Sequence, residues 1–410
     1  MLLDMLQDWA GWLLMLFTFS IVLMWKRVRS DTKVVHTIWF CIFLHHAVAY
    51  FSVYFPDATE FHANGVRLAT LPELEWLPNF SNGAANYTYF LGFIYRTFSA
   101  SLLFGNELSV LAFTLSCVVL VKLVDLLDLW RFRVGIVLFF GLLPSSIVFR
   151  SVTLRESWQA LFFLLFVYWA IRLWKRSGIL TLLFMLMCAL CMALLHQGLA
   201  RYAVYLIVIS LYWHIFSRYI SVRWPYSVRF LFAGLLLACV IITSQKMGLL
   251  MTPREAVESG AEMHRSLLAH TDIRTNLSFI PDASSVLGIV ITVPMVFAEY
   301  MFAPFPWQVE NDKDILALLE SMLRFVLLFF AVSSWRRSSG EVRSCYSFLL
   351  ITVLGMELVW ALGTANWGTA IRHHVPGCGV IVLLGVPGLI LFMRKLHFGM
   401  FGVEKIMVNK

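Results

Sequence analysis

The amino-acid sequence predicts an all-α, polytopic integral membrane protein with about eleven transmembrane helices. First, 60% of its 410 residues are hydrophobic and only 14% are charged, whereas soluble domains carry roughly 25% charged residues. Second, the chain contains repeated apolar runs near the length of about 20 residues that a spanning helix needs. Third, Lys and Arg gather in every second loop between these runs, as the positive-inside rule expects of cytoplasmic loops.

The expected spans follow the apolar runs in chain order. They cover residues 10–25, 34–54, 107–124, 134–150, 156–174, 178–196, 202–217, 230–247, 314–334, 343–362 and 375–393. With the N-terminus outside and the C-terminus in the cytoplasm, 20 of the 32 Lys and Arg residues fall on the cytoplasmic side. The net charge of +8 belongs largely to this loop bias, so it does not indicate nucleic-acid binding.

Two further apolar stretches fit poorly as spans. Residues 86–104 contain Arg96 in mid-run, and residues 286–303 contain Pro294 and Glu299. Counting either one alone as a span would reverse every later loop. We therefore expect both to be re-entrant or interfacial helices on the outer face, the second as a hairpin over 286–308.

Irregular backbone at membrane depth requires a covering protein or a water-filled cavity. The long outer loops 55–106 and 248–313 are accordingly expected to form an active-site cavity. No internal repeat or linker divides the chain, so residues 1–410 are expected to form a single membrane domain.

Acidic residues follow the second expected span directly, on the outer side. Asp57 and Glu60 are three residues apart and share a face if this segment is helical, with His62 close behind. A carboxylate just above the bilayer can act as a general base for a sugar hydroxyl, or bind a divalent cation. The alternative is that Asp57 caps a short helix after Pro56.

A short outer turn carries Arg150, Arg155 and Glu156. Arg can bind a phosphate through two parallel N–H bonds. The alternatives are that these side chains reach for the interface or form a structural ion-pair network.

Two more outer turns combine Arg with His. One carries His196 and Arg201, and the other runs from Asn366 to Arg372 and His373. Histidine changes its protonation most easily near neutral pH. A metal is not expected, because His373 and the histidine after it point apart on a helix and no carboxylate stands at ligand spacing.

Four local patterns resemble bacterial polytopic glycosyltransferases of the GT-C type and the neighbouring polysaccharide polymerases of the Wzy and EpsG-like kind. These patterns are Asp57-Ala-x-Glu-Phe-His62, Leu154-Arg-Glu-Ser157 after Leu143-Pro-Ser-Ser146, Phe302-Ala-Pro-Phe-Pro-Trp-Gln308, and Asn366-Trp-Gly-Thr-Ala-Ile-Arg-His-His374. Together they extend from about residue 55 to residue 375, which is most of the chain.

The resemblance implies transfer of sugar from a polyprenyl-linked donor on the outer face of the bacterial inner membrane. The acidic loop follows the second span rather than the first, and no separate soluble domain is present. Both departures favour a polymerase of O-antigen or exopolysaccharide repeat units. The expected partners are polyprenyl-diphosphate-linked donor and acceptor glycans, membrane lipid, and chain-length regulator and flippase proteins, with no cofactor. The alternatives are a GT-C enzyme adding one sugar from a polyprenyl-phosphate donor, and a flippase or transporter of lipid-linked sugars.

The expected roles follow from diphosphate chemistry. Outer Arg and His neutralise the charge of the leaving diphosphate, and the remaining task is to position an acceptor hydroxyl. The residues expected to be catalytic are Asp57, Glu60, Arg372 and His373. Those expected to bind substrate are His62, Arg150, Arg155, Glu156, His196, Arg201, Arg254, Arg265, Trp307 and Asn366.

Overall fold

The computed structural model describes residues 8–51, 54–72, 80, 82–215, 252–270 and 275–400. Within these residues every regular element is a helix, apart from an isolated β-bridge between Asn276 and Asn366. The helices are α2 (Trp9–Leu23), α3 (Lys26–Arg29), α4 (Thr32–Phe51), α5 (Pro56–Ala69), α6 (Gly83–Thr97), α7 (Leu102–Leu126), η1 (Trp130–Phe132), α8 (Arg133–Leu142), α9 (Pro144–Phe149), α10 (Glu156–Lys175), α11 (Ile179–Leu195), α12 (Gln197–Ile215), α14 (Pro253–His270), α15 (Val286–Phe302), η3 (Pro306–Gln308), α16 (Asp312–Arg337), α17 (Gly340–Leu362), α18 (Trp367–His373) and α19 (Val375–Met400).

Seven described helices are long and apolar enough to cross a membrane: α4, α7, α10, α12, α16, α17 and α19. Helices α2 and α11 are apolar but shorter. The span expected over 134–150 is divided into α8 and α9 at Pro144, which cannot donate a backbone hydrogen bond and begins the second helix. The span expected over 230–247 lies outside the described residues. The fold is therefore compatible with a multi-pass membrane protein, and the count of eleven stays a prediction.

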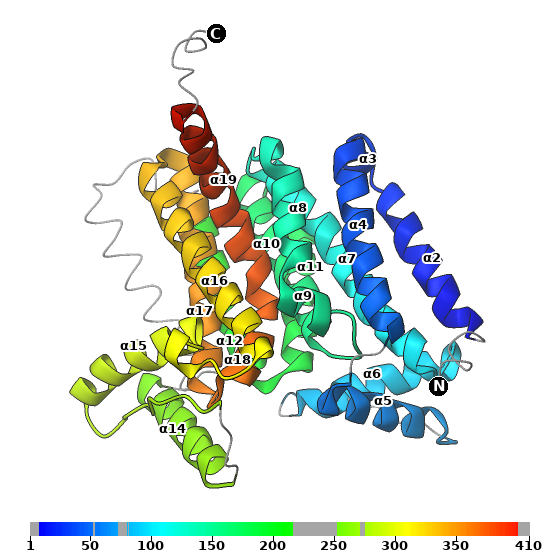
Figure 1. The fold of residues 1–410 in the computed structure, drawn as a ribbon, viewed down its shortest axis with the longest axis horizontal. Coiled ribbons are helices and arrows are strands. Elements are labelled where there is room, and N and C mark those ends of the chain that lie inside the picture. The colour runs from blue at the N-terminus through cyan, green and yellow to red at the C-terminus, as the bar shows by residue number, and fades with distance from the viewer. Residues whose placement is uncertain are drawn as a thin grey trace.

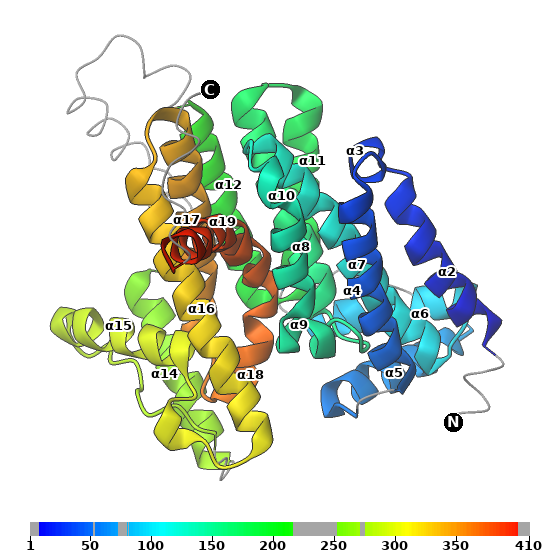
Figure 2. The ribbon, with the colours of Figure 1, turned by 45° about the horizontal axis from the view of Figure 1, so that its top comes forward.

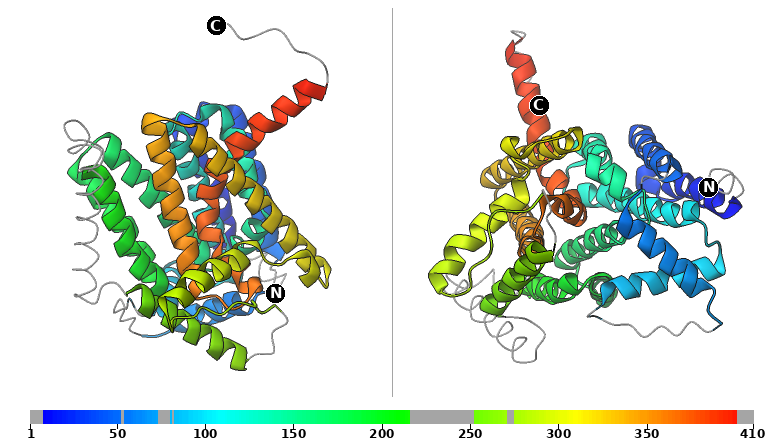
Figure 3. Two further views of the ribbon diagram at one scale, coloured as in Figure 1. Left: turned by 90° about the vertical axis from the view of Figure 1, so that its left-hand side faces the viewer. Right: turned by 60° about the horizontal axis from the view of Figure 1, so that its bottom comes forward.

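The long helices run between two ends of different character (Figure 1). Helices α5, α6, α14, α15 and α18 gather at the lower end in that view, and Figure 3 shows this end from below. The upper end carries α3 and several basic side chains with their carboxylate partners. There Arg27 lies 3.7 Å from Asp125, and Lys175 lies 3.4 Å from Glu341. These two ion pairs bring residues of four expected cytoplasmic loops to one end of the bundle, and the side of the membrane that this end faces stays a prediction.

The two stretches that fit poorly as spans form α6 and α15, which lie across the lower end of the bundle (Figures 1 and 3). Helix α6 ends at Thr97, and Leu102 already begins α7, so the expected boundary at residue 104 is wrong. The break expected at Pro294 is also wrong, because α15 continues through it and ends only at Phe302. A proline removes a single helical hydrogen bond, and here the helix persists on both sides of it. The break expected at Pro304 and Pro306 is present, since α15 has ended there and the short helix η3 follows, and the hairpin over 286–308 stays a prediction.

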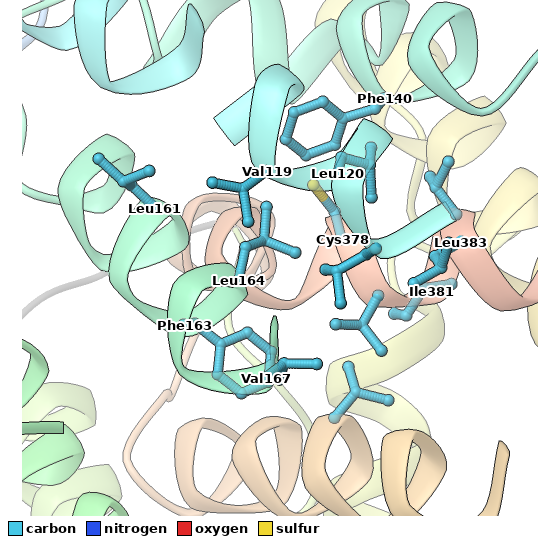
Figure 4. Packing of buried hydrophobic residues seen from close by; sticks show 14 of the residues in the cluster. Val119, Leu120, Phe140, Leu161, Phe163, Leu164, Val167, Cys378, Ile381 and Leu383 are labelled. Carbon is cyan, nitrogen blue, oxygen red and sulfur yellow. The ribbon is translucent and has the colours of Figure 1, made fainter. Parts of the chain in front are cut away.

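The core is centred on α19, whose residues from Val380 to Val386 are buried (Figure 4). In Figure 4, Cys378 and Ile381 lie among side chains of α7, α8 and α10, including Phe140 and Leu164. By contrast, α11 and α16 expose rows of large apolar side chains, and such surfaces are compatible with membrane contact.

One buried polar contact in the core was not expected from the sequence. His46 Nδ1 lies 2.6 Å from Glu107 Oε2, and His46 Nε2 lies 2.8 Å from Thr18 Oγ1. These three side chains join α4, α7 and α2. Burial of such groups is tolerated where they pair with one another.

Candidate functional site

The candidate site is built around Arg372, in the last turn of the short helix α18. Asn366 begins this helix, because its side chain accepts the Thr369 N–H at 2.7 Å. Arg372 Nη1 donates to Asp57 Oδ2, and Arg372 Nε lies 3.1 Å from Glu156 Oε1. The guanidinium is thus held between a half-exposed carboxylate on α5 and a buried carboxylate at the start of α10.

Arg155 adds a second cation beside this ion-pair network. Its Nη1 donates to the Leu195 carbonyl oxygen at 3.2 Å, and its guanidinium carbon lies 5.7 Å from the Phe61 ring centroid. These contacts place Arg155 between α5, α10 and the end of α11. We name Asp57, Arg155, Glu156, His196, Arg372 and His373 the α18 cluster.

Two imidazoles of the cluster have complementary hydrogen bonds. His196 Nδ1 accepts the Gly198 N–H at 3.0 Å, so its proton is on Nε2. Thr364 Oγ1 donates to the Trp360 carbonyl at 2.7 Å and lies 2.8 Å from His373 Nδ1. His373 therefore donates from Nδ1, which leaves the lone pair on its Nε2.

Both imidazoles are held neutral. Burial, with the nearby Arg155 and Arg372 guanidinium groups, lowers the pKa of His196 to about 3. Burial and Arg372 likewise lower the pKa of His373 well below its usual range. The Trp360 ring contacts both imidazoles, 4.4 Å from the His196 centroid and 4.2 Å from the His373 centroid, and these two centroids are 6.5 Å apart. The cluster therefore presents one imidazole donor and one imidazole acceptor.

Several buried polar atoms here have no hydrogen-bond partner among the described residues. Three of them are Arg155 Nε, Trp360 Nε1 and Glu156 Oε2. A buried polar atom without a partner costs about 1–3 kcal/mol. Two of these three atoms are donors, and an anionic ligand supplies acceptors.

A second polar layer lies next to the cluster. His374 Nδ1 lies 2.6 Å from Glu357 Oε2, and Tyr300 Oη donates to the same oxygen at 3.2 Å. A Cβ added at Gly377 would meet the other Glu357 oxygen at 2.3 Å, so this close approach requires glycine. His373 and His374 thus bond to different partners, as their adjacent helical positions predicted.

Three other expected site residues lie outside the α18 cluster. Arg150 is fully buried and donates to the Val375 carbonyl at 2.7 Å. His62 Nδ1 bonds the Tyr95 hydroxyl at 3.0 Å, which turns it toward α6. Glu60 is exposed and forms no ion pair or hydrogen bond within the described residues. Arg150 and His62 therefore have structural contacts of their own in this state.

The remaining expected residues lie on other elements. Arg254 pairs with Glu258 at 2.9 Å on α14, and Arg265 is exposed on the same helix. Trp307 is 78% exposed. Arg201 is partly buried in α12. No hydrogen bond or ion pair among the described residues joins Arg201, Arg254, Arg265 or Trp307 to the α18 cluster.

The structure tests the interpretation of Asp57 as a helix cap, while its role as a site residue stays a prediction. The N-cap of α5 is Phe55, and Asp57 stands inside the first turn with its carboxylate bonded to Arg372. The capping interpretation is therefore wrong. Trp360 and Tyr300 were missed from the sequence, because an aromatic residue inside an apolar helix has no pattern that separates a site from a core.

Within the described residues, no group of three or more His, Cys, Asp or Glu side chains is arranged to hold a metal ion. No family model, curated protein or solved structure matches this chain. The fold and the cluster thus define a class: an all-helical protein with apolar helices compatible with several membrane crossings, and a buried Arg, His and carboxylate cluster at one end of its bundle.

Proposed function

We propose that this protein is a membrane glycosyltransferase that polymerises polyprenyl-diphosphate-linked oligosaccharide units on the outer face of a bacterial inner membrane. The observation that carries the proposal is the α18 cluster, in which two guanidinium groups and two neutral imidazoles meet at one end of the bundle. This combination suits an anionic leaving group that departs while a hydroxyl loses its proton.

The proposed reaction forms one bond and breaks one. The acceptor hydroxyl oxygen bonds to the anomeric carbon of the donor sugar, while the bond from that carbon to the diphosphate oxygen breaks. The electron pair leaves on the polyprenyl diphosphate, whose negative charge Arg155 and Arg372 stabilise. His373 Nε2 accepts the hydroxyl proton, and His196 Nε2–H donates a hydrogen bond to the phosphate.

The low basicity of His373 fits this chemistry. Burial and Arg372 lower its pKa in the described state. A bound diphosphate would bring negative charge near the ring and raise that pKa again, because a nearby anion stabilises the imidazolium. His373 would then become a competent base only when the donor is bound.

The position of Asp57 supports a polymerase over a transferase that adds a single sugar. A transferase with a strong carboxylate base requires that carboxylate to be available to the acceptor. Asp57 instead bonds to Arg372, so its proposed role is to orient the guanidinium.

Loss of the protein from its host tests this function. We expect a polyprenyl-diphosphate-linked single repeat unit to accumulate on the outer leaflet, and long glycan to disappear. A lipid-linked glycan lacking one sugar would instead indicate the single-sugar transferase. Accumulation of the full unit on the cytoplasmic leaflet would indicate a flippase.

The proposed orientation has a separate test in a cysteine-free background. Glu60→Cys on α5 and Ser339→Cys between α16 and α17 place exposed thiols at opposite ends of the bundle. We expect an impermeant maleimide added outside the cell to label position 60 and not position 339. The reverse pattern would overturn the orientation.

A further inference from the structure

The upper end of the bundle holds a basic pocket that plays no part in the proposed reaction. Its volume is about 410 Å³, and its lining residues come from α3, α7, α10 and the residue that follows α10. Figure 2 shows the arrangement of these helices. The cations lining it are Arg27, Lys122, Arg172, Lys175 and Arg176. We name it the basic pocket.

The positive charge in the basic pocket is only partly balanced. Arg27 lies 3.7 Å from Asp125, and Asp125 is shared with Arg133, whose Nε donates to it at 2.6 Å. Lys175 lies 3.4 Å from Glu341. The other three lining cations have no carboxylate within ion-pair distance among the described residues.

Aromatic and backbone contacts hold these cations in place without neutralising them. Lys122 Nζ lies 3.3 Å from the Trp25 ring centroid, and Arg172 Nη1 lies 3.2 Å from the Tyr168 hydroxyl oxygen. Lys175 Nζ donates to the Leu126 carbonyl at 2.8 Å. All five cations line one pocket, although Arg27, Arg172, Lys175 and Arg176 are also exposed to solvent. Their arrangement therefore favours a bound anion.

Exposed apolar side chains stand close in sequence to two lining residues of the basic pocket, before Arg27 and after Arg176. Leu23 and Met24 are exposed immediately before Trp25, and Ile179 and Leu180 are exposed at the start of α11. An anion with attached alkyl chains would neutralise the cations of the pocket and also cover these apolar side chains. Basic pockets between transmembrane helices on the cytoplasmic side bind phospholipid headgroups in this way.

We propose that the basic pocket binds a phosphate group, supplied by the headgroup of an anionic phospholipid in the cytoplasmic leaflet. The phosphate oxygens would accept hydrogen bonds from Lys122, Arg172 and Arg176, and the acyl chains would lie along α2 and α11. Soluble phosphate compounds share the headgroup chemistry but lack the chains, so an experiment can separate the two sources.

The test uses the full-length protein purified in neutral detergent, with bound lipid counted by native mass spectrometry. Phosphatidylglycerol and phosphatidylcholine are titrated in separate arms, and glycerol 3-phosphate competes in a third arm. We expect saturable binding of phosphatidylglycerol, much weaker binding of phosphatidylcholine, and no displacement by millimolar glycerol 3-phosphate.

Variants with matched charge identify the site. Each cation near a membrane surface is worth about fivefold in anionic-lipid affinity, so Lys122→Gln with Arg172→Gln should weaken phosphatidylglycerol binding by about 25-fold. Arg29→Gln with Lys33→Gln removes the same charge from the same end outside the pocket, and should leave the tight site intact.

Two outcomes would overturn the proposal. If both double variants weaken binding equally, the lipid responds to general charge and not to the pocket. If glycerol 3-phosphate displaces the lipid at micromolar concentration, the pocket is a site for a soluble phosphate compound. Because Lys122 is partly buried against Trp25, Arg176→Gln at an exposed lining position is the second variant, and it should weaken binding by about fivefold.

Discussion

The pairing of Arg372 with Asp57 and Glu156 predicts a specific pattern of coupling among variants. Asp57→Asn removes an ion pair whose carboxylate is half exposed, and exposed pairs are worth about 0.2–1 kcal/mol. If Asp57 only orients Arg372, the loss of activity should stay below about tenfold, because about 1.4 kcal/mol corresponds to a factor of ten. Loss of a general base would instead cost about 10²- to 10⁴-fold.

Arg372→Gln should be far more damaging to activity. Removing one group that stabilises transition-state charge costs about 10²- to 10³-fold. The double variant Asp57→Asn with Arg372→Gln should then be no worse than Arg372→Gln alone, because residues in direct contact do not contribute additively. The assay is the rate of glycan extension on a purified lipid-linked donor.

The loss of folding stability in Arg372→Gln must be distinguished from its loss of catalytic activity. Arg372→Gln leaves the buried Glu156 carboxylate without its main partner, and breaking a buried pair costs about 3–5 kcal/mol. Glu156→Gln with Arg372→Gln leaves no such charge, so it should recover thermal stability and stay inactive. A well-folded Asp57→Asn that loses 10²-fold or more, with the double variant showing the product of both losses, would refute the orienting role.

Two further predictions concern packing and pH. Gly385→Ala should lower the stability by about 1–3 kcal/mol, because its methyl would meet the backbone of α16 at 2.4 Å. Gly178→Ala should leave the melting temperature unchanged, because its methyl would meet only Thr181 Oγ1, at an ordinary contact distance of 3.8 Å. Equal melting temperatures for both variants would contradict the close packing of α16 and α19. The pKa of His196 is about 3 in the folded protein and roughly 6.5 in the unfolded chain. Between these values only the unfolded chain binds the extra proton, so the free energy of unfolding should fall as the pH drops below about 6.5. His196→Asn with His373→Asn should make this fall in melting temperature shallower, and an unchanged slope would show that the imidazoles are not held neutral.

The sequence predicted the helices well because a long apolar run constrains a helix strongly. It also predicted most of the α18 cluster, since Asp57, Glu156 and Arg372 each flank an expected span on the same side. Residues at the ends of spans on one side of a membrane lie at the same depth, so they come into contact wherever the helix ends pack together. The breaks inside apolar runs were harder, as the continuity of α15 through Pro294 shows.

The sequence could not show which other residues lie beside the α18 cluster and which lie away from it. Arg254 finds its partner Glu258 one helical turn away, and His62 bonds to Tyr95 on the neighbouring helix α6. Nothing in the sequence spacing distinguishes such bonds from a shared site. Trp360 and Glu357 lie within a span, and their position beside His373 and His374 depends on how α17 and α18 pack. Tertiary packing, and not local pattern, selects these residues.

The most direct measurement is glycan extension by the purified protein in liposomes, using a synthetic polyprenyl-diphosphate-linked oligosaccharide as both donor and acceptor. The wild-type protein should produce a ladder of products that grow by one repeat unit and release polyprenyl diphosphate in equal amount. The stable Glu156→Gln, Arg372→Gln variant should produce neither. If the wild-type protein leaves the oligosaccharide unchanged, or if the variant extends it at the same rate, the α18 cluster is not the site of a polymerase.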